Sequence, residues 1–269
     1  MERKNIHNKA YKRCIYTIFA CLVIVSVLRL PTLAAGEAYN WYCKRNKEHK
    51  QPIVDGNMAF IEKYDGYYID KRHGDKEEEK VVYLTFDAGY ENGNVARILD
   101  ALKDEGVHGA FFILGNLIER NTGLVERMTA EGHLVCNHTV HHHDMTRVSS
   151  KGEFERELRA LEKLYTEKTG KTLAKYYRPP EGRFDEKTME YAKSIGYKTV
   201  FWSIAYADWD NGKQPSVEEA KKKILDNLHN GAVILLHPTS ETNALIIGDV
   251  IREIKAQGYR FGTLDELTV

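Results

Sequence analysis

The sequence predicts an α/β protein in which parallel strands are covered by helices, and three observations support this. Over most of the 269-residue chain, short apolar runs alternate with stretches whose apolar residues recur three and four positions apart. Glycines stand between most of the helical stretches and the apolar runs that follow them. With 42% hydrophobic and 29% charged residues, the composition is globular, and the length suits one enzyme-sized domain plus a short extra segment.

Seven apolar runs, rich in Val, Ile, Phe and Tyr, are predicted to be buried strands. The six helical stretches between them end near glycines, which readily take the left-handed conformation that closes a helix. One strand followed by six helix–strand repeats predicts a parallel sheet with helices outside, but leaves open whether the sheet is open or an incomplete barrel. The predicted strands are residues 81–86, 109–114, 133–136, 175–177, 198–204, 232–236 and 259–261, and the glycines are Gly106, Gly132, Gly170, Gly196, Gly231 and Gly258.

Residues 1–34 have the pattern of an export signal. Residues 1–13 are polar and basic, residues 14–28 are a mostly apolar run, and small residues follow. This pattern predicts a secretory signal peptide that is cleaved after Ala34. An uncleaved membrane anchor is the alternative: the apolar run is shorter than the ~20 residues that span a bilayer, although Arg29 can extend it by snorkelling. We therefore expect an exported protein that contacts the membrane only through this segment.

Residues 35–80 do not follow the alternating pattern. Three aromatic residues lie at positions 39–42, and a polar run at 70–80 is expected to be a solvated loop. The segment is too short for an independent domain, so we expect it to be an extension packed on a catalytic domain at 81–269.

The charge balance argues against nucleic acid as a partner. Lys plus Arg and Asp plus Glu both number 39, and without residues 1–34 the chain has 33 basic and 38 acidic residues, a net charge of −5. The sequence has no basic stripe, so binding by neutralisation of phosphates is not expected. The two cysteines beyond residue 34, Cys43 and Cys136, are too few for a disulfide framework.

Ionisable residues stand at or near the ends of five predicted strands. Any one of them alone would ordinarily be a helix cap or a solvated loop residue. Because the carboxyl ends of parallel strands lie at one face, where such folds bind ligands, we expect the five side chains to converge on an active site. They are Asp87, His138, Arg178, Asp208 and His237.

His138 and His142 are spaced as a metal-binding pair. Four positions separate them, so on one helical turn both imidazoles face the same way and can share a cation such as Zn²⁺. A histidine-rich surface loop without metal is the alternative. A catalytic zinc also needs a third protein ligand and an open position for water.

The same residues belong to five motifs whose order resembles that of NodB-type polysaccharide deacetylases, carbohydrate esterase family 4. The motifs are TFD at 85–87, HTxxH at 138–142, RPPxG at 178–182, DW at 208–209 and LLH at 235–237. The longer sequences TFDAGYENG and FWSIAYADW are similar to the branch that deacetylates N-acetylmuramic acid on the way to the muramic δ-lactam of spore cortex. The resemblance covers residues 80–265 and implies a distorted, incomplete (β/α) barrel.

The resemblance implies a catalytic role for each of these residues. Asp87 would be the general base that deprotonates the attacking water, and Arg178 would keep it ionised. His237 would be the general acid for the departing amine, and Asp208 would hold its imidazole and raise its pKa. The backbone N–H of Glu181 would help to stabilise the tetrahedral oxyanion.

Two further residues are candidates for substrate binding. Arg183 follows the RPPxG motif and is expected near the oxyanion site, where a guanidinium would bind the lactyl carboxylate that distinguishes muramic acid from glucosamine. A surface arginine in a solvated loop is the alternative. Trp209, in the DW motif, is the second candidate.

The resemblance also implies a divalent metal, expected to be Zn²⁺, held by His138 and His142. The family usually supplies a third ligand from an Asp directly after the base, but this position is Ala88 here. Glu91 and Asn92 are the nearest polar candidates for a third ligand. We therefore expect the metal to be bound less tightly than is usual in the family.

We predict a metal-dependent hydrolase that removes the N-acetyl group of N-acetylmuramic acid in peptidoglycan, leading to the δ-lactam of spore cortex. Two alternatives remain: a deacetylase of N-acetylglucosamine in peptidoglycan or a chitin-like polymer, and an inactive carbohydrate-binding relic that lost its site through Ala88. The expected partner is a peptidoglycan glycan strand in the cell wall or spore cortex, and we expect a monomer.

Overall fold

The computed structural model describes residues 37–74 and 78–269, of which Ala38–Val269 form one compact unit. The predicted signal segment, residues 1–34, lies outside the described residues. Within the described ranges, every helix is too short or too polar to cross a membrane.

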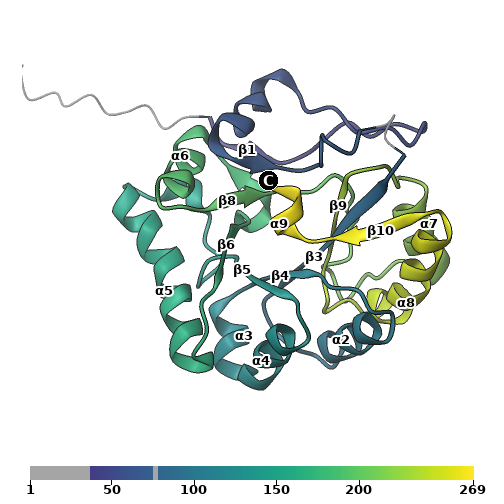
Figure 1. Ribbon diagram of the computed structural model, residues 1–269. Coiled ribbons are helices and arrows are strands. Elements are labelled where there is room, and N and C mark those ends of the chain that lie inside the picture. Colours follow the sequence, from purple (N-terminus) through teal and green to yellow (C-terminus); the bar gives the residue numbers. More distant parts are fainter. Residues whose placement is uncertain (1–36, 75–77) are drawn as a thin grey trace, which may run out of the picture. The chain divides into compact units, whose positions relative to one another are not determined.

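All seven predicted strands are present, and they run parallel in one curled sheet with helices on its outer side (Figure 1). The order is β10-β3-β4-β5-β6-β8-β2, and β9 also pairs with β3. Between β8 and β9, bonds from the backbone of Ser203 and Ile204 to the carbonyl of Val233 replace a full strand pair, so the barrel is incomplete, as expected. The strands are β2 (Gly66–Tyr67), β3 (Lys80–Ala88), β4 (Ala110–Ile113), β5 (Leu134–Asn137), β6 (Ala174–Tyr177), β8 (Lys198–Val200), β9 (Ala232–Leu236) and β10 (Tyr259–Gly262).

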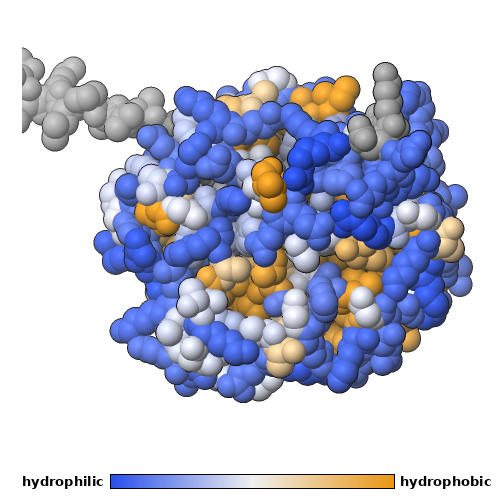
Figure 2. Space-filling model, in the orientation of Figure 1, coloured by the Kyte–Doolittle hydropathy of each residue, from blue (hydrophilic) through white to orange (hydrophobic). Residues whose placement is uncertain are grey.

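The helices bury the apolar sides that their sequences predict. In α2, the side chains of Val95, Ile98, Leu99 and Leu102 are fully buried in the main hydrophobic core, and α2 packs against α8. Hydrophilic residues cover most of the face shown in Figure 2, where hydrophobic atoms are visible mainly over the strands. The helices are α2 (Asn94–Asp104), α3 (Gly115–Arg120), α4 (Thr122–Ala130), α5 (Lys151–Thr169), α6 (Glu186–Ser194), α7 (Val217–Leu225), α8 (Glu241–Ala256) and α9 (Leu264–Leu267), with 3-10 turns at Gly56–Tyr64, Met145–Arg147 and Pro180–Gly182.

The six glycines predicted to end helices all have left-handed backbones, with φ between 62° and 86°. Five of them follow a helix within two residues. The prediction is wrong for Gly231, which lies beyond the end of α7 in the turn before β9. Glycine is required here because the backbone of Asp70 packs closely against it: a Cβ at this position would lie 2.4 Å from the backbone oxygen of Asp70.

Residues 37–74 pack along β8 and the chain that follows it. The Trp41 ring stacks on Phe201 with 4.3 Å between centroids, and its indole N–H donates to the Trp202 carbonyl at 2.8 Å. The short strand β1 (Tyr39–Asn40) pairs antiparallel with β7 (Arg183–Phe184), directly after the RPPxG motif. These contacts tie the segment to a wall of the predicted active site.

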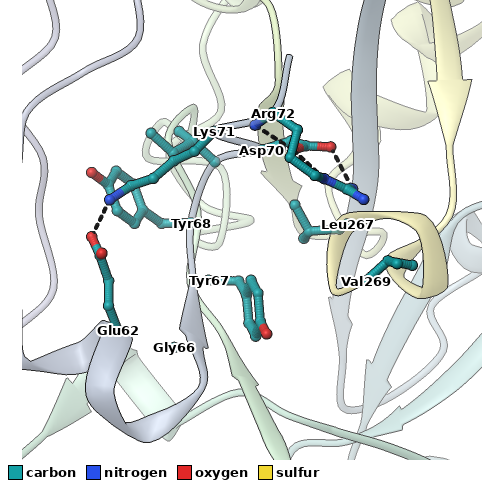
Figure 3. A pocket seen from close by; sticks show the side chains of 10 residues that line it. Glu62, Gly66, Tyr67, Tyr68, Asp70, Lys71, Arg72, Leu267 and Val269 are labelled. Atoms are coloured by element: carbon teal, nitrogen blue, oxygen red, sulfur yellow. Dashed lines mark hydrogen bonds and ion pairs between the residues drawn. The ribbon is translucent and has the colours of Figure 1, made fainter. Parts of the chain in front are cut away.

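The expectation of a solvated loop beginning at residue 70 is wrong for its first residue. Asp70 is buried, and its carboxylate accepts hydrogen bonds from Arg72 and from the Tyr83 hydroxyl, the latter at 2.5 Å, which offset the cost of burying the charge. A pocket of about 200 Å³ lies beside it, where Lys71 pairs with Glu62 (Figure 3). The charged side chains that line this pocket are thus paired within the protein.

Candidate active site

A cavity of about 540 Å³ opens at the carboxyl ends of the strands. Asp87 near the end of β3, His138 directly after β5 and His237 directly after β9 all reach it, because parallel strands bring their carboxyl ends to one face. Six residues singled out from the sequence line its wall: Asp87, His138, His142, Glu181, Trp209 and His237.

Asp87 is paired with a fully buried arginine. Its Oδ1 accepts a hydrogen bond from Nη1 of Arg178 at 2.8 Å. The other guanidinium nitrogens donate to the Thr85 hydroxyl, the Val200 carbonyl and the Phe201 carbonyl. Burial favours the neutral carboxyl, but the Arg178 charge, together with His138, His237 and the hydrogen bond from Arg178, holds the pKa of Asp87 below its ordinary value. Asp87 is therefore an ionised carboxylate in the cavity.

His138 presents one defined ring nitrogen to the cavity. Its Nδ1 lies 2.8 Å from the Arg178 carbonyl oxygen, which can only accept, so Nδ1 carries the proton. The unprotonated Nε2 lies 3.5 Å from Oδ2 of Asp87. Burial lowers the pKa of His138 to about 4, and burial also lowers the pKa of His142. Both rings, 5.0 Å apart, are thus neutral at neutral pH and able to bind a metal.

The histidine pair does not lie on a helical turn, contrary to the sequence prediction. Residues 138–143 form a loop in which Thr139 and His142 have left-handed backbones, with φ of 70° and 61°. Two hydrogen bonds hold this shape: the Asn137 side chain accepts from the Thr139 amide, and the Thr139 hydroxyl accepts from the His142 amide. The loop brings both imidazoles to the cavity all the same.

His237 is held by a buried carboxylate. Its Nδ1 donates to Oδ1 of Asp208 at 2.7 Å, and its backbone N–H donates to Oδ2 at 2.8 Å. Asn243, at the start of α8, donates to the same Oδ2 at 2.6 Å. Burial disfavours the charged ring, but the hydrogen bond and charge of Asp208 raise the pKa of His237 above its ordinary value. The arrangement produces an imidazole that is readily protonated.

The position after Asp87 faces away from the cavity. Ala88 is fully buried in the main hydrophobic core, because successive strand residues point to opposite faces. The two alternative third ligands are engaged at the start of α2: Glu91 accepts from the amides of Gly93 and Val95, and Asn92 donates to the Thr239 carbonyl. A third protein ligand from residues 88–92 would require a different local conformation.

Of the three remaining predicted residues, Glu181 and Trp209 line the cavity wall, and Arg183 is not among the lining residues. Glu181 has a left-handed backbone, with φ of 58°, at the cavity wall; such strain in a non-glycine residue is commonly retained at functional sites. Trp209 is 62% exposed, with its ring 6.3 Å from that of His237. Arg183 follows the wall residue Gly182, and its Nε lies 3.0 Å from a carboxylate oxygen of Asp144.

Two supporting residues were not identified from the sequence. Asn243, on a helix distant in sequence, donates a hydrogen bond to Asp208, and no local sequence pattern predicts this contact. Thr85 belongs to the TFD motif, but only the structure shows its hydroxyl between Arg178 and the Ile234 carbonyl. The aromatic wall formed by Trp202 and Tyr206 was also missed, although both lie in the sequence FWSIAYADW.

Residues 74–200 match the family described as polysaccharide deacetylase. Peptidoglycan-N-acetylmuramic acid deacetylase PdaA of Bacillus subtilis is 38% identical over 232 residues, which are 86% of each chain. This chain belongs to the polysaccharide deacetylase family. The structure of PdaA, described as a family 4 carbohydrate esterase, superposes with a TM-score of 0.80 over 86% of this chain and 97% of that one.

Other similar deacetylases differ in substrate or activity. A peptidoglycan-N-acetylglucosamine deacetylase of Bacillus cereus is 33% identical over 195 residues, covering 70% of this chain and 88% of its own. A family 4 pseudoenzyme from Bacillus anthracis has a TM-score of 0.65 at 25% identity, covering 71% of this chain and 66% of its own. Family membership therefore establishes a hydrolase fold, and the substrate must be argued from the site.

Deacetylases of this family are metal-dependent, and the donors in the cavity fit a divalent cation. His138 offers an unprotonated Nε2, fixed by the bond from its Nδ1, which is the usual arrangement of a metal-binding histidine. His142 is neutral, and the ionised Asp87 adds negative charge beside them. The residues present can hold a cation through two imidazoles.

Proposed function

We propose that this protein hydrolyses the N-acetyl group of N-acetylmuramic acid in peptidoglycan, with Zn²⁺ as the metal. The observation that carries the proposal is the pairing of an ionised carboxylate, Asp87, with a readily protonated imidazole, His237, on the wall of one cavity. The similarity to PdaA over 86% of both chains supports muramic acid as the sugar.

Asp87 acts as the general base. It takes a proton from the water that attacks the acetyl carbonyl carbon, and Arg178 keeps it ionised between turnovers. His138 and His142 would hold the metal, which when bound would supply Lewis-acid polarisation of the carbonyl. The backbone N–H of Glu181 donates to the carbonyl oxygen as negative charge develops on it.

His237 acts as the general acid. It gives its proton to the sugar nitrogen as the C–N bond breaks, so that acetate and the free amine leave. The Asp208 carboxylate orients the ring through Nδ1 and stabilises its protonated form, which leaves Nε2 as the nitrogen that donates. Trp209, exposed beside His237, offers an aromatic face on which a sugar ring can pack.

The protein is proposed to act outside the cytoplasm. Residues 1–34 have the sequence pattern of an export signal, and both named substrates among the relatives are peptidoglycan sugars. We propose a monomer acting on glycan strands of the cell wall or spore cortex, with the product leading to muramic δ-lactam.

One experiment separates this proposal from its two alternatives. Purified peptidoglycan is treated with the protein and Zn²⁺, digested to muropeptides, and analysed by mass spectrometry for the sugar that lost its acetyl group. Loss from muramic acid supports the proposal, and loss from glucosamine supports the second function. Binding to glycan without release of acetate would identify an inactive relic, as the pseudoenzyme among the relatives shows to be possible in this family.

Replacement of His138 or His142 by alanine is expected to lower the metal bound in the cavity and to reduce activity. Two imidazoles without a carboxylate from position 88 leave few ligands, so a chelator should inactivate the wild type and added Zn²⁺ should restore it. Elemental analysis together with acetate release tests this. Full activity in metal-free protein would contradict the assignment.

Replacement of Asp208 by asparagine is expected to move the alkaline limb of the kcat/KM profile to lower pH. The carboxylate raises the pKa of His237, so its removal lets the ring lose its proton at lower pH, and the acid form disappears earlier. Asp210→Asn, two positions along the same loop, is the control. An unmoved alkaline limb in Asp208→Asn would show that His237 is not the acid.

We infer that Arg183 binds the lactyl carboxylate of muramic acid. Its Nε already contacts Asp144, but a guanidinium has two terminal nitrogens beyond Nε. Arg183→Ala should weaken transition-state binding of muramic acid substrates by ~1.5–3 kcal/mol and leave glucosamine-only oligomers nearly unchanged. Measurement of kcat/KM on both substrates tests this, and equal losses would place selectivity elsewhere.

A further inference from the structure

The histidine-rich loop after β5 presents rings on two sides. His142 lines the catalytic cavity, whereas the side chains of His141 and His143 are 60% and 67% exposed. The two exposed rings stack on each other, with 5.2 Å between centroids and 19° between planes. The loop thus carries a second pair of imidazoles that the deacetylation mechanism does not use.

A carboxylate from another element completes this outer group. Glu157, in the middle of α5, is largely buried, and its Oε1 lies 2.9 Å from Nδ1 of His141 and 3.7 Å from Nδ1 of His143. Among the described residues, these three form the group of potential metal ligands whose donor atoms all lie within 4.8 Å of one another. We propose that His141, His143 and Glu157 form a second, exchangeable site for a transition-metal ion.

The donor set selects the class of ion. Two imidazole nitrogens and one carboxylate oxygen suit Zn²⁺ and similar ions, whereas Mg²⁺ and Ca²⁺ prefer oxygen ligands throughout. Tetrahedral zinc with bonds of ~2.0–2.2 Å requires donor atoms roughly 3.3–3.5 Å apart. The present separations of 2.9 and 3.7 Å from the Glu157 oxygen lie on either side of this range, and the donor atoms of all three residues lie within 4.8 Å of one another.

Exposure determines how firmly the ion is held. Both imidazoles face solvent, so water would occupy the remaining positions and the ion would exchange readily. A bound ion would join the loop to α5, and the joined loop also carries His142. Occupation of the outer site would therefore restrain the segment that supplies one side of the catalytic cavity.

Zinc stoichiometry in matched variants tests the proposal independently of deacetylase activity. The full chain, purified without a histidine tag, is dialysed against increasing Zn²⁺ and analysed for bound metal. We expect about two equivalents in the wild type, and loss of the weaker one in the double variant His141→Ala/His143→Ala. The double variant His138→Ala/His142→Ala should keep the outer equivalent, which separates this site from the catalytic one.

Two single variants complete the test. Glu157→Gln should weaken the second equivalent by about tenfold or more. His108→Ala, which removes an exposed histidine elsewhere, should bind as the wild type does. Thermal unfolding checks that Glu157→Gln is folded. If it is not folded, the zinc stoichiometry of His141→Ala/His143→Ala alone tests the proposal. Absence of bound zinc in His138→Ala/His142→Ala, or a zinc equivalent in that variant that survives the further change His141→Ala/His143→Ala, would overturn the proposal.

Discussion

Asp87→Asn is expected to reduce acetate release by ~10²–10⁴-fold, the usual cost of losing a general base. The substitution keeps the size of the side chain and the oxygen that accepts from Arg178, but removes the charge that takes the proton. Turnover on peptidoglycan fragments should fall while the affinity for glycan stays close to that of the wild type.

The control for this variant is Asp104→Asn, which makes the same chemical change at an exposed position at the end of α2. Circular dichroism and glycan binding show whether each variant is folded. If folded Asp87→Asn releases acetate at nearly the wild-type rate, Asp87 is not the base and the proposed mechanism fails at its first step.

The strands were predictable because each is a short run rich in Val, Ile, Phe and Tyr between stretches with helical periodicity. The helix ends were predictable where a glycine closes the helix, as at Gly106 and Gly170. The incomplete seam between β8 and β9 was not predictable from periodicity, since it depends on backbone bonds from Ser203 and Ile204 to Val233, which lies thirty residues beyond Ser203. A local pattern carries no information about such a contact.

For the candidate site, the sequence identified the functional residues and the common face on which they lie, but not the residues that hold them in position. The histidine pair was predicted for a helical turn, whereas side-chain bonds from Asn137 and Thr139 hold a left-handed loop instead. The sequence showed that Ala88 stands where the family usually has a metal-binding Asp. Only the structure shows that the Ala88 side chain faces the hydrophobic core. Supports of this kind arise from tertiary contacts between distant elements.

Arg178 is the most important of these supporting residues, because its charged guanidinium is buried away from solvent. Its guanidinium is fully buried, lies 4.1 Å from the centre of the Phe112 ring, and donates to Asp87, Thr85 and two carbonyls. A buried charge pair adds little net stability when intact, but loss of one partner leaves the other charge buried and unpaired. Arg178 therefore links the stability of the barrel to the ionisation of its base.

Arg178→Met is expected to lower the free energy of unfolding by ~3–5 kcal/mol, as measured by chemical denaturation. Arg159→Met, which removes an exposed ion pair with Glu155, should cost no more than about 1 kcal/mol. The double variant Asp87→Asn/Arg178→Met should recover part of the loss, because the stranded charge is then gone. Equal costs for Arg178→Met and Arg159→Met, or no recovery in the double variant, would show that the buried pair does not couple the fold to the base.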